Sequence, residues 1–415
     1  MAARHFRTIL ALIVTYGLLG LLMNSVGTVI LQSIKHYGVS KPHAATLEAC
    51  KDLSVVAASF LFAVQLPRFG FRRAQIGVML AIGSGALLLP FANAFWATQL
   101  FFVLTGLCFG IAKVATYSSI GLIRADREGH ASLTTLIEGM FMVGILIGIW
   151  TFGWFIDQDR TGHDWLHVYW LIAGLCAIAA LLWWTVRLDE SAAAATPGVG
   201  AVDRREMFAL ALLPATISFL IAIFLYVLVE QSIGTWLPTF NNEILHLPPG
   251  MSVQAASIFV AALALGRLGA APLVQRLGWL RLLLGCLACM GVLVVLTLPL
   301  TRGVEMRPDV TWGSAPVAAY LFPLIGVLMA PIYPITCSVM LSTLPRDRHA
   351  AMVGLIVIFS ALGGTIGSFI TGLVFQYFSG QTAFYLVLVP IGATAAALLR
   401  FHAVAEGRSA ERLVV

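Results

Sequence analysis

Apolar stretches long enough to cross a membrane recur along the whole chain. They are separated by short polar segments that hold most of the charged residues. About 20 consecutive apolar residues span the hydrocarbon of a bilayer as an α-helix. The pattern therefore predicts an all-α integral membrane protein with twelve transmembrane helices. The predicted spans are 8–33, 44–66, 74–94, 96–123, 131–156, 166–187, 206–236, 251–275, 281–300, 314–344, 350–376 and 382–400.

The composition agrees with this pattern. The chain of 415 residues is 60% hydrophobic and only 11% charged, whereas soluble domains have about 25% charged residues. Its net charge of +6 does not indicate nucleic acid binding, because the basic residues lie in short loops. Most of them fall in the segments on the side of the two termini. This bias predicts cytoplasmic termini in a multi-pass protein of the cell inner membrane, with the first span retained.

One internal segment has the composition of a linker. It covers residues 188–205 (LDESAAAATPGVGAVDRR) and follows the sixth span. We expect it to lie in the cytoplasm between an N-terminal half, 1–187, and a C-terminal half, 206–415.

Short motifs recur in the two halves in the same order. Such recurrence predicts two parallel six-helix repeats around a central cavity. The matches are Asn24–Thr28 with Gln231–Thr235, Arg68–Gly70 with Arg276–Gly278, and Arg127, His130, Gly144 and Gly148 with Arg346, His349, Gly363 and Gly367.

This organisation resembles the major facilitator superfamily over essentially the whole chain. The resemblance implies that spans 1, 2, 4, 5, 7, 8, 10 and 11 line the cavity. Seven charged residues fall well inside the spans, and all of them lie on helices of that set. They are Glu48, Lys51, Asp52, Lys113, Glu138, Glu230 and Arg267.

Several motifs are similar to those of the fucose–galactose–proton symporter branch. They are Tyr226–Glu230 (YVLVE), Gly266–Gly269 (GRLG) and Met23–Ser25 (MNS). The resemblance implies proton-coupled sugar transport. However, Ser25 and Lys113 stand where members that transport fucose carry acids, and Glu138 stands where they carry a glutamine. The sugar specificity and the coupling residues of that branch therefore cannot be transferred.

The intramembrane charges supply the candidates for proton coupling. Glu48, Lys51 and Asp52 lie on one face of a helix. The spans contain four acids and three bases, so not every acid can have its own base. An unpaired carboxyl in low dielectric favours its protonated form. Asp52 is the first candidate, followed by Glu48, Glu138 and Glu230. The alternative is a structural ion pair that holds the second helix against a neighbour.

We expect Lys113 and Glu138 to approach each other across the fourth and fifth helices. They form either a permanent salt bridge or a pair that opens when solute or proton arrives. Alternatively, Lys113 meets a carboxylate or phosphate of an anionic or zwitterionic solute as a point charge.

The other candidate residues divide into two groups. The expected solute contacts are Asn24, Lys51, Lys113, Tyr117, Tyr226, Gln231 and Trp236; Tyr226 and Trp236 either stack on a sugar ring or anchor the helix at the membrane interface. The expected structural or gating residues are Arg68, Gly70, Arg267, Gly144, Gly148, Gly363, Gly367, Pro331 and Pro334. The glycines permit close helix contact, and the prolines predict a kink in the tenth span.

The motifs of other function classes do not occur in the sequence. It contains no phosphate-binding loop, nucleophile triad or metal-ligand spacing. We therefore expect no enzyme activity, no cofactor and no metal, and energy from a solute or ion gradient. The sequence predicts a monomeric secondary transporter with proton-coupled symport of a small polar solute, either a sugar or an anionic or zwitterionic metabolite. Sodium remains open as the coupling ion, and the alternative function is a proton-driven exporter of a metabolite or toxic compound.

Overall fold

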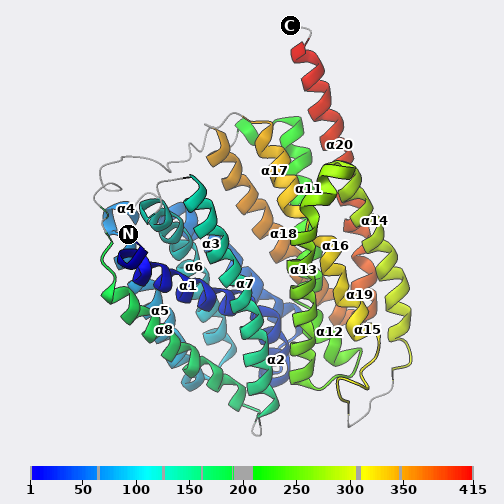
Figure 1. Cartoon of the computed structure of the whole chain (residues 1–415). Coiled ribbons are helices and arrows are strands. Elements are labelled where there is room, and N and C mark those ends of the chain that lie inside the picture. The colour runs from blue at the N-terminus through cyan, green and yellow to red at the C-terminus, as the bar shows by residue number, and fades with distance from the viewer. Residues whose placement is uncertain are drawn as a thin grey trace. The chain divides into compact units, whose positions relative to one another are not determined.

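The computed structural model describes residues 2–62, 66–123, 127–159, 162–188, 190, 209–304, 310–344 and 348–413. Every regular element in these ranges is a helix (Figure 1). The chain forms two compact units. Unit 1 consists of Met1–Val39 and Thr46–Ala201, and unit 2 of Ser40–Ala45 and Val202–Val415. Most of the predicted linker lies outside the described residues.

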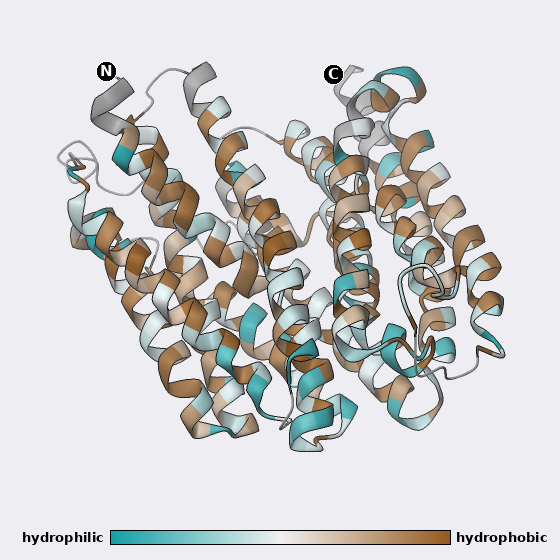
Figure 2. Ribbon diagram, turned by 60° about the horizontal axis from the view of Figure 1, so that its bottom comes forward, coloured by the Kyte–Doolittle hydropathy of each residue, from teal (hydrophilic) through white to brown (hydrophobic). Residues whose placement is uncertain are grey.

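Eleven helical segments in the described ranges are long and apolar enough to cross a membrane. Hydrophobic residues, brown in Figure 2, recur along these helices. One further helix, α3 (Lys41–Phe62), has 22 residues and therefore the length of a span. It carries Glu48, Lys51 and Asp52, which lower its apolarity. That α3 crosses the membrane as the twelfth helix stays a prediction.

The helices of unit 1 follow one another through short connections. In chain order they are α1 (Ala2–Met23), α2 (Val26–Tyr37), α3 from Thr46 onward, α4 (Leu66–Phe69), α5 (Phe71–Ala92), α6 (Phe95–Ile123), α7 (Arg127–Asp157), η1 (Asp164–His167) and α8 (Val168–Thr185).

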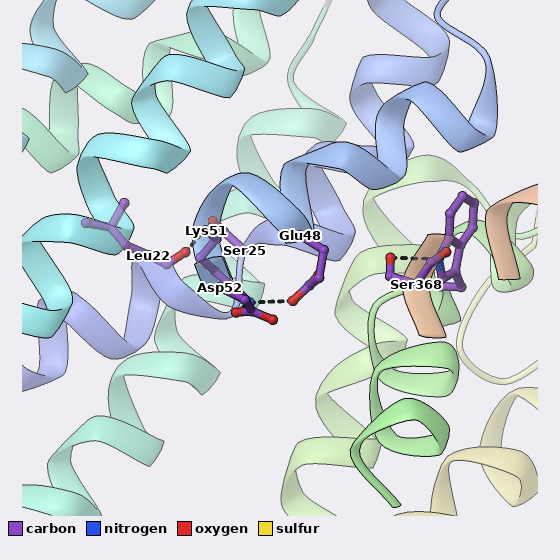
Figure 3. Close-up of polar contacts among 7 residues, drawn as sticks. Leu22, Ser25, Glu48, Lys51, Asp52 and Ser368 are labelled. Carbon is purple, nitrogen blue, oxygen red and sulfur yellow. Dashed lines mark hydrogen bonds and ion pairs between the residues drawn. The ribbon is translucent and has the colours of Figure 1, made fainter. Parts of the chain in front are cut away.

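The first predicted span, 8–33, is not one continuous helix. It is interrupted at Asn24 and Ser25, between α1 and α2. The Ser25 hydroxyl donates a hydrogen bond of 2.7 Å to the carbonyl oxygen of Leu22 (Figure 3). A serine that binds a nearby backbone group offers an alternative to the regular helical hydrogen bond. The apolar pattern of the span continues through this point, so it gave no sign of the break.

Glycines bring α1 and α7 into backbone contact. A Cβ atom at Gly144 would overlap the carbonyl oxygen of Gly17, and one at Gly20 would overlap that of Phe141. Gly148 lies against Leu21 in the same way. The close contact predicted for Gly144 and Gly148 is therefore present inside unit 1.

The helices of unit 2 include several short pieces. They are α11 (Pro214–Gly234), α12 (Leu237–Glu243), α13 (Pro249–Leu277), α14 (Trp279–Thr297), η2 (Leu298–Thr301), α15 (Ala318–Leu321), η3 (Phe322–Leu324), α16 (Ile325–Met329), α17 (Ile332–Ser342), α18 (His349–Tyr377), α19 (Gly380–Leu386) and α20 (Leu388–Leu413). The helix is interrupted between α16 and α17 at Ala330 and Pro331. Pro331 and Pro334 predicted a kink at this place, because each lacks a backbone donor.

Glycines also join α18 to α11. A Cβ atom at Gly363 would overlap the carbonyl oxygen of Phe224, and Gly367 lies against the backbone of Leu228. The contact in unit 2 thus resembles the contact between α7 and α1 in unit 1, and it involves the glycines that the sequence matches to Gly144 and Gly148.

Two further matched glycines have the same backbone geometry. Gly70 (φ 97°) precedes α5 and Gly278 (φ 76°) precedes α14, both in a region that side chains disfavour. The amide of each donates to the carbonyl four residues earlier, Leu66 in one unit and Val274 in the other. The side chain of Arg68, which belongs to the same motif, is outside the described part of the chain.

The start of α5 and the end of α8 are joined by two side chains. The Glu190 carboxylate accepts hydrogen bonds from the amides of Phe71 (3.0 Å) and Arg72 (2.8 Å), so it caps α5. The Arg72 guanidinium donates to the carbonyl oxygens of Trp183 (3.1 Å) and Trp184 (2.7 Å), near the end of α8. These contacts fix one end of unit 1.

Candidate functional site

Two acids on α3 share one lysine. The Nζ atom of Lys51 lies 2.5 Å from Oε1 of Glu48 and 3.3 Å from Oδ1 of Asp52. The Glu48 side chain is fully buried, while that of Asp52 is 19% exposed. Figure 3 shows the three side chains together on α3. We call these residues the α3 triad.

The position of the α3 triad depends on two glycines of α6. A Cβ atom at Gly106 would overlap the carbonyl oxygen of Lys51, and one at Gly110 would lie 2.7 Å from the Cβ of Ala58. The G-x-x-x-G spacing thus lets the backbones of α3 and α6 touch. The main chain of Lys51 therefore lies at the contact between α3 and α6.

The charges of the α3 triad do not cancel when both acids are ionised. One ammonium then faces two carboxylates, and the sum is one negative charge. Burial of an uncompensated charge is costly, so binding of one proton is the simplest way to neutralise the group. Asp52 is the better recipient, because its contact with Lys51 is longer and its side chain is more exposed than that of Glu48.

A second polar cluster joins α1, α6 and α7. The Tyr117 hydroxyl donates a hydrogen bond to the Glu138 carboxylate. The ring of Tyr16 meets that of Tyr117 edge to face at 6.4 Å, and it lies 5.9 Å from the ring of Phe141. The Phe109 ring is also 5.9 Å from Phe141. Glu138 therefore sits among aromatic side chains from three helices.

The expected approach of Lys113 to Glu138 is not observed. Both residues lie in the described ranges, and they form no ion pair there; Glu138 is bound by Tyr117, and the Lys113 ammonium lies over the ring of Phe109, 5.9 Å from its centre. The physical reason is the helical repeat. Phe109, Lys113 and Tyr117 follow one another at one-turn intervals, and Tyr117 is the residue that reaches the carboxylate.

The contact with Phe109 does not offset the cost of the Lys113 charge. A cation over an aromatic ring at an exposed site gains about 0.5–1 kcal/mol, whereas a charge at the centre of a bilayer costs about 2.5–3.5 kcal/mol or more. Lys113 is near the middle of the 29-residue helix α6, too deep for its side chain to reach either end. It is nevertheless exposed, while all other residues from 101 to 120 are buried or half-buried.

Unit 2 has a polar cluster of its own on α11, α13 and α17. The Tyr226 hydroxyl donates to the carbonyl oxygen of Met329 (3.1 Å), at the break in the tenth span. The Tyr333 ring lies 6.1 Å from that of Tyr226. Glu230 interacts with Tyr226 and with the charge of Arg267. The structure therefore brings Tyr226, Glu230 and Arg267 together.

Arg267 is placed by the glycine that precedes it. A Cβ atom at Gly266 would overlap the carbonyl oxygen of Val327 and would lie 2.6 Å from the Cβ of Ala330. The missing side chain thus lets α13 approach α16, and Arg267 remains exposed beside this contact. The structural role expected for Arg267 stays a prediction.

Trp236 is a packing residue. It is fully buried, and its Nε1 atom donates to the main-chain oxygen (3.0 Å) and the hydroxyl (3.1 Å) of Ser368. Its ring stacks on Phe375 at 5.2 Å. The expectation that Trp236 stacks on a solute is therefore not supported, because no face of the ring is open.

The other predicted solute contacts are placed differently. Asn24 is exposed at the break between α1 and α2, whereas Gln231 is half-buried on α11. The sequence interpretation did not select Tyr16, Tyr333, Gly106 or Gly110. The spacing of Gly106 and Gly110 was a visible signal, but nothing in the sequence distinguishes Tyr16 and Tyr333 from other tyrosines in spans.

The sequence profile of the Major Facilitator Superfamily matches residues 12–306. The chain belongs to this superfamily. No curated protein sequence matches the chain. Superfamily membership and eleven apolar spans make it a multi-pass membrane protein and a transporter rather than an enzyme.

Solved transporter structures resemble the whole chain. The crystal structure of the nucleoside transporter NupG has a TM-score of 0.73 at 14% identity, with 96% of this chain and 98% of that chain covered. The inward open structure of the xylose transporter XylE from E. coli has a TM-score of 0.72 at 13% identity, with 95% and 96% covered. At these identities the similarity shows the fold. The resemblance to the fucose–galactose–proton symporter branch stays a prediction.

Proposed function

We propose that the protein is a secondary active transporter that works by alternating access and carries a small polar solute together with a proton. The observation that carries the proposal is the sharing of Lys51 by Glu48 and Asp52. A permanent structural pair needs one acid for one base, but the α3 triad has two acids. The second acid provides a place for one proton, with Asp52 as its carrier.

Alternating access requires two halves that change their arrangement around a solute. We take these halves to be the predicted repeats, 1–187 and 206–415, joined by a cytoplasmic linker. The matching glycine contacts on α7 and α18, and the matching geometry of Gly70 and Gly278, support this assignment. We further propose a monomer in the cell inner membrane, with both termini in the cytoplasm, as the distribution of basic residues indicates.

Solute-dependent proton uptake into proteoliposomes tests the proposal. The panel contains neutral sugars, nucleosides, amino acids and carboxylates, and a dye inside the vesicles reports pH. We expect one class of solute to cause proton uptake, and Asp52→Asn to lower that uptake at least tenfold while counterflow of the labelled solute continues. Asp157→Asn, which changes an exposed acid at the end of α7, is the matched control and should behave as the unmodified protein.

Two results would contradict the proposal. Solute counterflow with no proton uptake would show that the α3 triad is structural. Dependence of solute uptake on a sodium gradient would show that sodium, and not the proton, is the coupling ion. Outward movement of solute against an inward proton gradient would instead identify the exporter.

A further inference from the structure

Lys113 is the intramembrane cation that the proton-coupling mechanism leaves unused. Lys51 is shared by two acids, and the charge of Arg267 acts on Glu230. Lys113, in contrast, has no ion pair among the described residues and contacts only the Phe109 ring through its ammonium. It is also exposed on an otherwise covered part of α6. A cation in this position is available to an anionic ligand.

The residues around Lys113 define the rest of the ligand. Phe109 and Tyr117 flank Lys113 on α6 at one-turn intervals, Phe141 and Glu138 come from α7, and Tyr16 comes from α1. We call these six residues the Lys113 cluster. Their ring contacts, between 5.9 and 6.4 Å, form a continuous aromatic group beside one ammonium and one carboxylate.

We propose that the Lys113 cluster binds the acidic group of the solute, and that the solute is a small organic anion with one acidic group and with hydrogen-bond donors at its other end. The Lys113 ammonium meets a carboxylate or phosphate as a point charge. Glu138 is an acceptor when ionised, so it binds hydroxyl or ammonium donors and repels a second acidic group. The aromatic side chains cover the body of the solute. This inference rests on the proposed function and narrows its solute class.

The geometry favours an anion over a neutral sugar. A neutral solute would leave the Lys113 ammonium without an anionic contact, because the Glu138 carboxylate is bound by Tyr117 and forms no ion pair with Lys113 among the described residues. An anion would pair directly with the ammonium and replace its weak contact with Phe109.

Ligand-induced thermal stabilisation of the purified protein tests the inference without transport. The probes are matched pairs, glucuronate with glucose and galacturonate with galactose, together with glucose 6-phosphate and a neutral amino acid. We expect at least one anion to stabilise the protein and its neutral partner to bind at least tenfold more weakly. These probes show whether the acidic group that binds is the carboxylate of a sugar acid, a phosphate, or the carboxylate of a zwitterion.

Variants assign the effect to Lys113. Lys113→Gln should weaken binding of the anion at least tenfold, Lys113→Arg should keep part of the affinity, and Lys35→Gln, a lysine in the last turn of α2, is the control. Equal binding of a neutral sugar and its acid, full affinity in Lys113→Gln, or no Lys113-dependent stabilisation by any of the anions would overturn the inference.

The two proposals fail in different ways. Anion binding that depends on Lys113, without proton uptake in proteoliposomes, would reject the proposed proton coupling and keep the inference. Proton uptake driven by a neutral sugar, with Lys113→Gln fully active, would reject the inference and keep the coupling. Asp52→Asn should retain the anion-induced stabilisation, because Asp52 lies outside the Lys113 cluster.

Discussion

Glu48 and Lys51 form an ion pair of 2.5 Å within one turn of α3, and the acid is fully buried. Asp52 is the second acid on the same ammonium. Removal of Lys51 would therefore leave two carboxylates without their base, whereas removal of Asp52 would leave a complete pair. Removal of Lys51 should therefore lower the stability of the protein, whereas removal of Asp52 should lower proton uptake.

Lys51→Met should lower stability strongly. Breaking a buried ion pair by removing one partner costs about 3–5 kcal/mol. The measurement is thermal unfolding of the purified protein. The double variant Glu48→Gln with Lys51→Met should recover a large part of the loss, because it removes both charges. If the double variant is no more stable than the single one, the cost comes from packing and not from charge.

Gly144→Ala should disrupt the contact between α1 and α7. Its new Cβ atom would overlap the Gly17 carbonyl oxygen, so the two backbones must separate. Overpacking of this kind costs about 1–3 kcal/mol. Gly139→Ala on the same helix is the control, since a Cβ atom there meets nothing within 4 Å. Equal melting temperatures for the two variants would show that the helices separate without cost.

Trp236→Phe should affect stability but not solute recognition. The change removes the indole donor to Ser368 and leaves a smaller ring against Phe375. We expect a loss of about 1–3 kcal/mol in unfolding free energy, and an unchanged KM for solute uptake. Trp154→Phe, at a site that is 57% exposed, is the comparison. A tenfold rise in KM would show that Trp236 takes part in solute recognition.

His36→Phe should loosen the contacts that join α2 to the residue after α5 and to the segment before η1. His36 lies in the last turn of α2, and its ring bonds to Oδ1 of Asn93 (2.6 Å) and to the carbonyl oxygen of Gly162. Loss of two hydrogen bonds at an exposed site costs about 1–3 kcal/mol, and the ring contact with Tyr37 should remain. Faster hydrogen exchange near Asn93 and Gly162, with no change in the rest of the unit, is the expected result.

The sequence predicted the parts of the fold that depend on average polarity. Long apolar runs located the helices, and the two prolines marked the interruption at Ala330 and Pro331. The break at Asn24 and Ser25 was missed, because a serine that bonds to the Leu22 carbonyl does not interrupt the apolar pattern. A local hydrogen bond decided that feature, and hydropathy does not report such bonds.

The candidate site was predicted less completely than the fold. The face shared by Glu48, Lys51 and Asp52 followed from helical spacing on one helix. The partner of Glu138 did not, because it depends on how far α6 and α7 are shifted along each other. The carboxylate is bound by Tyr117, one turn after Lys113, and the Lys113 ammonium lies over Phe109, one turn before it. Contacts inside one helix can thus be read from spacing, whereas contacts between helices required the structure.

The ratio of two acids to one ammonium in the α3 triad has an electrical consequence. Moving one elementary charge through the membrane is worth about 2.3 kcal/mol per 100 mV. If the triad takes up one proton per cycle, a solute monoanion enters with no net charge, and the voltage across the membrane neither assists nor opposes it. A neutral solute would bring in one positive charge and would be driven by the voltage as well. The current that accompanies uptake in a voltage-clamped vesicle therefore measures the charge of the solute directly.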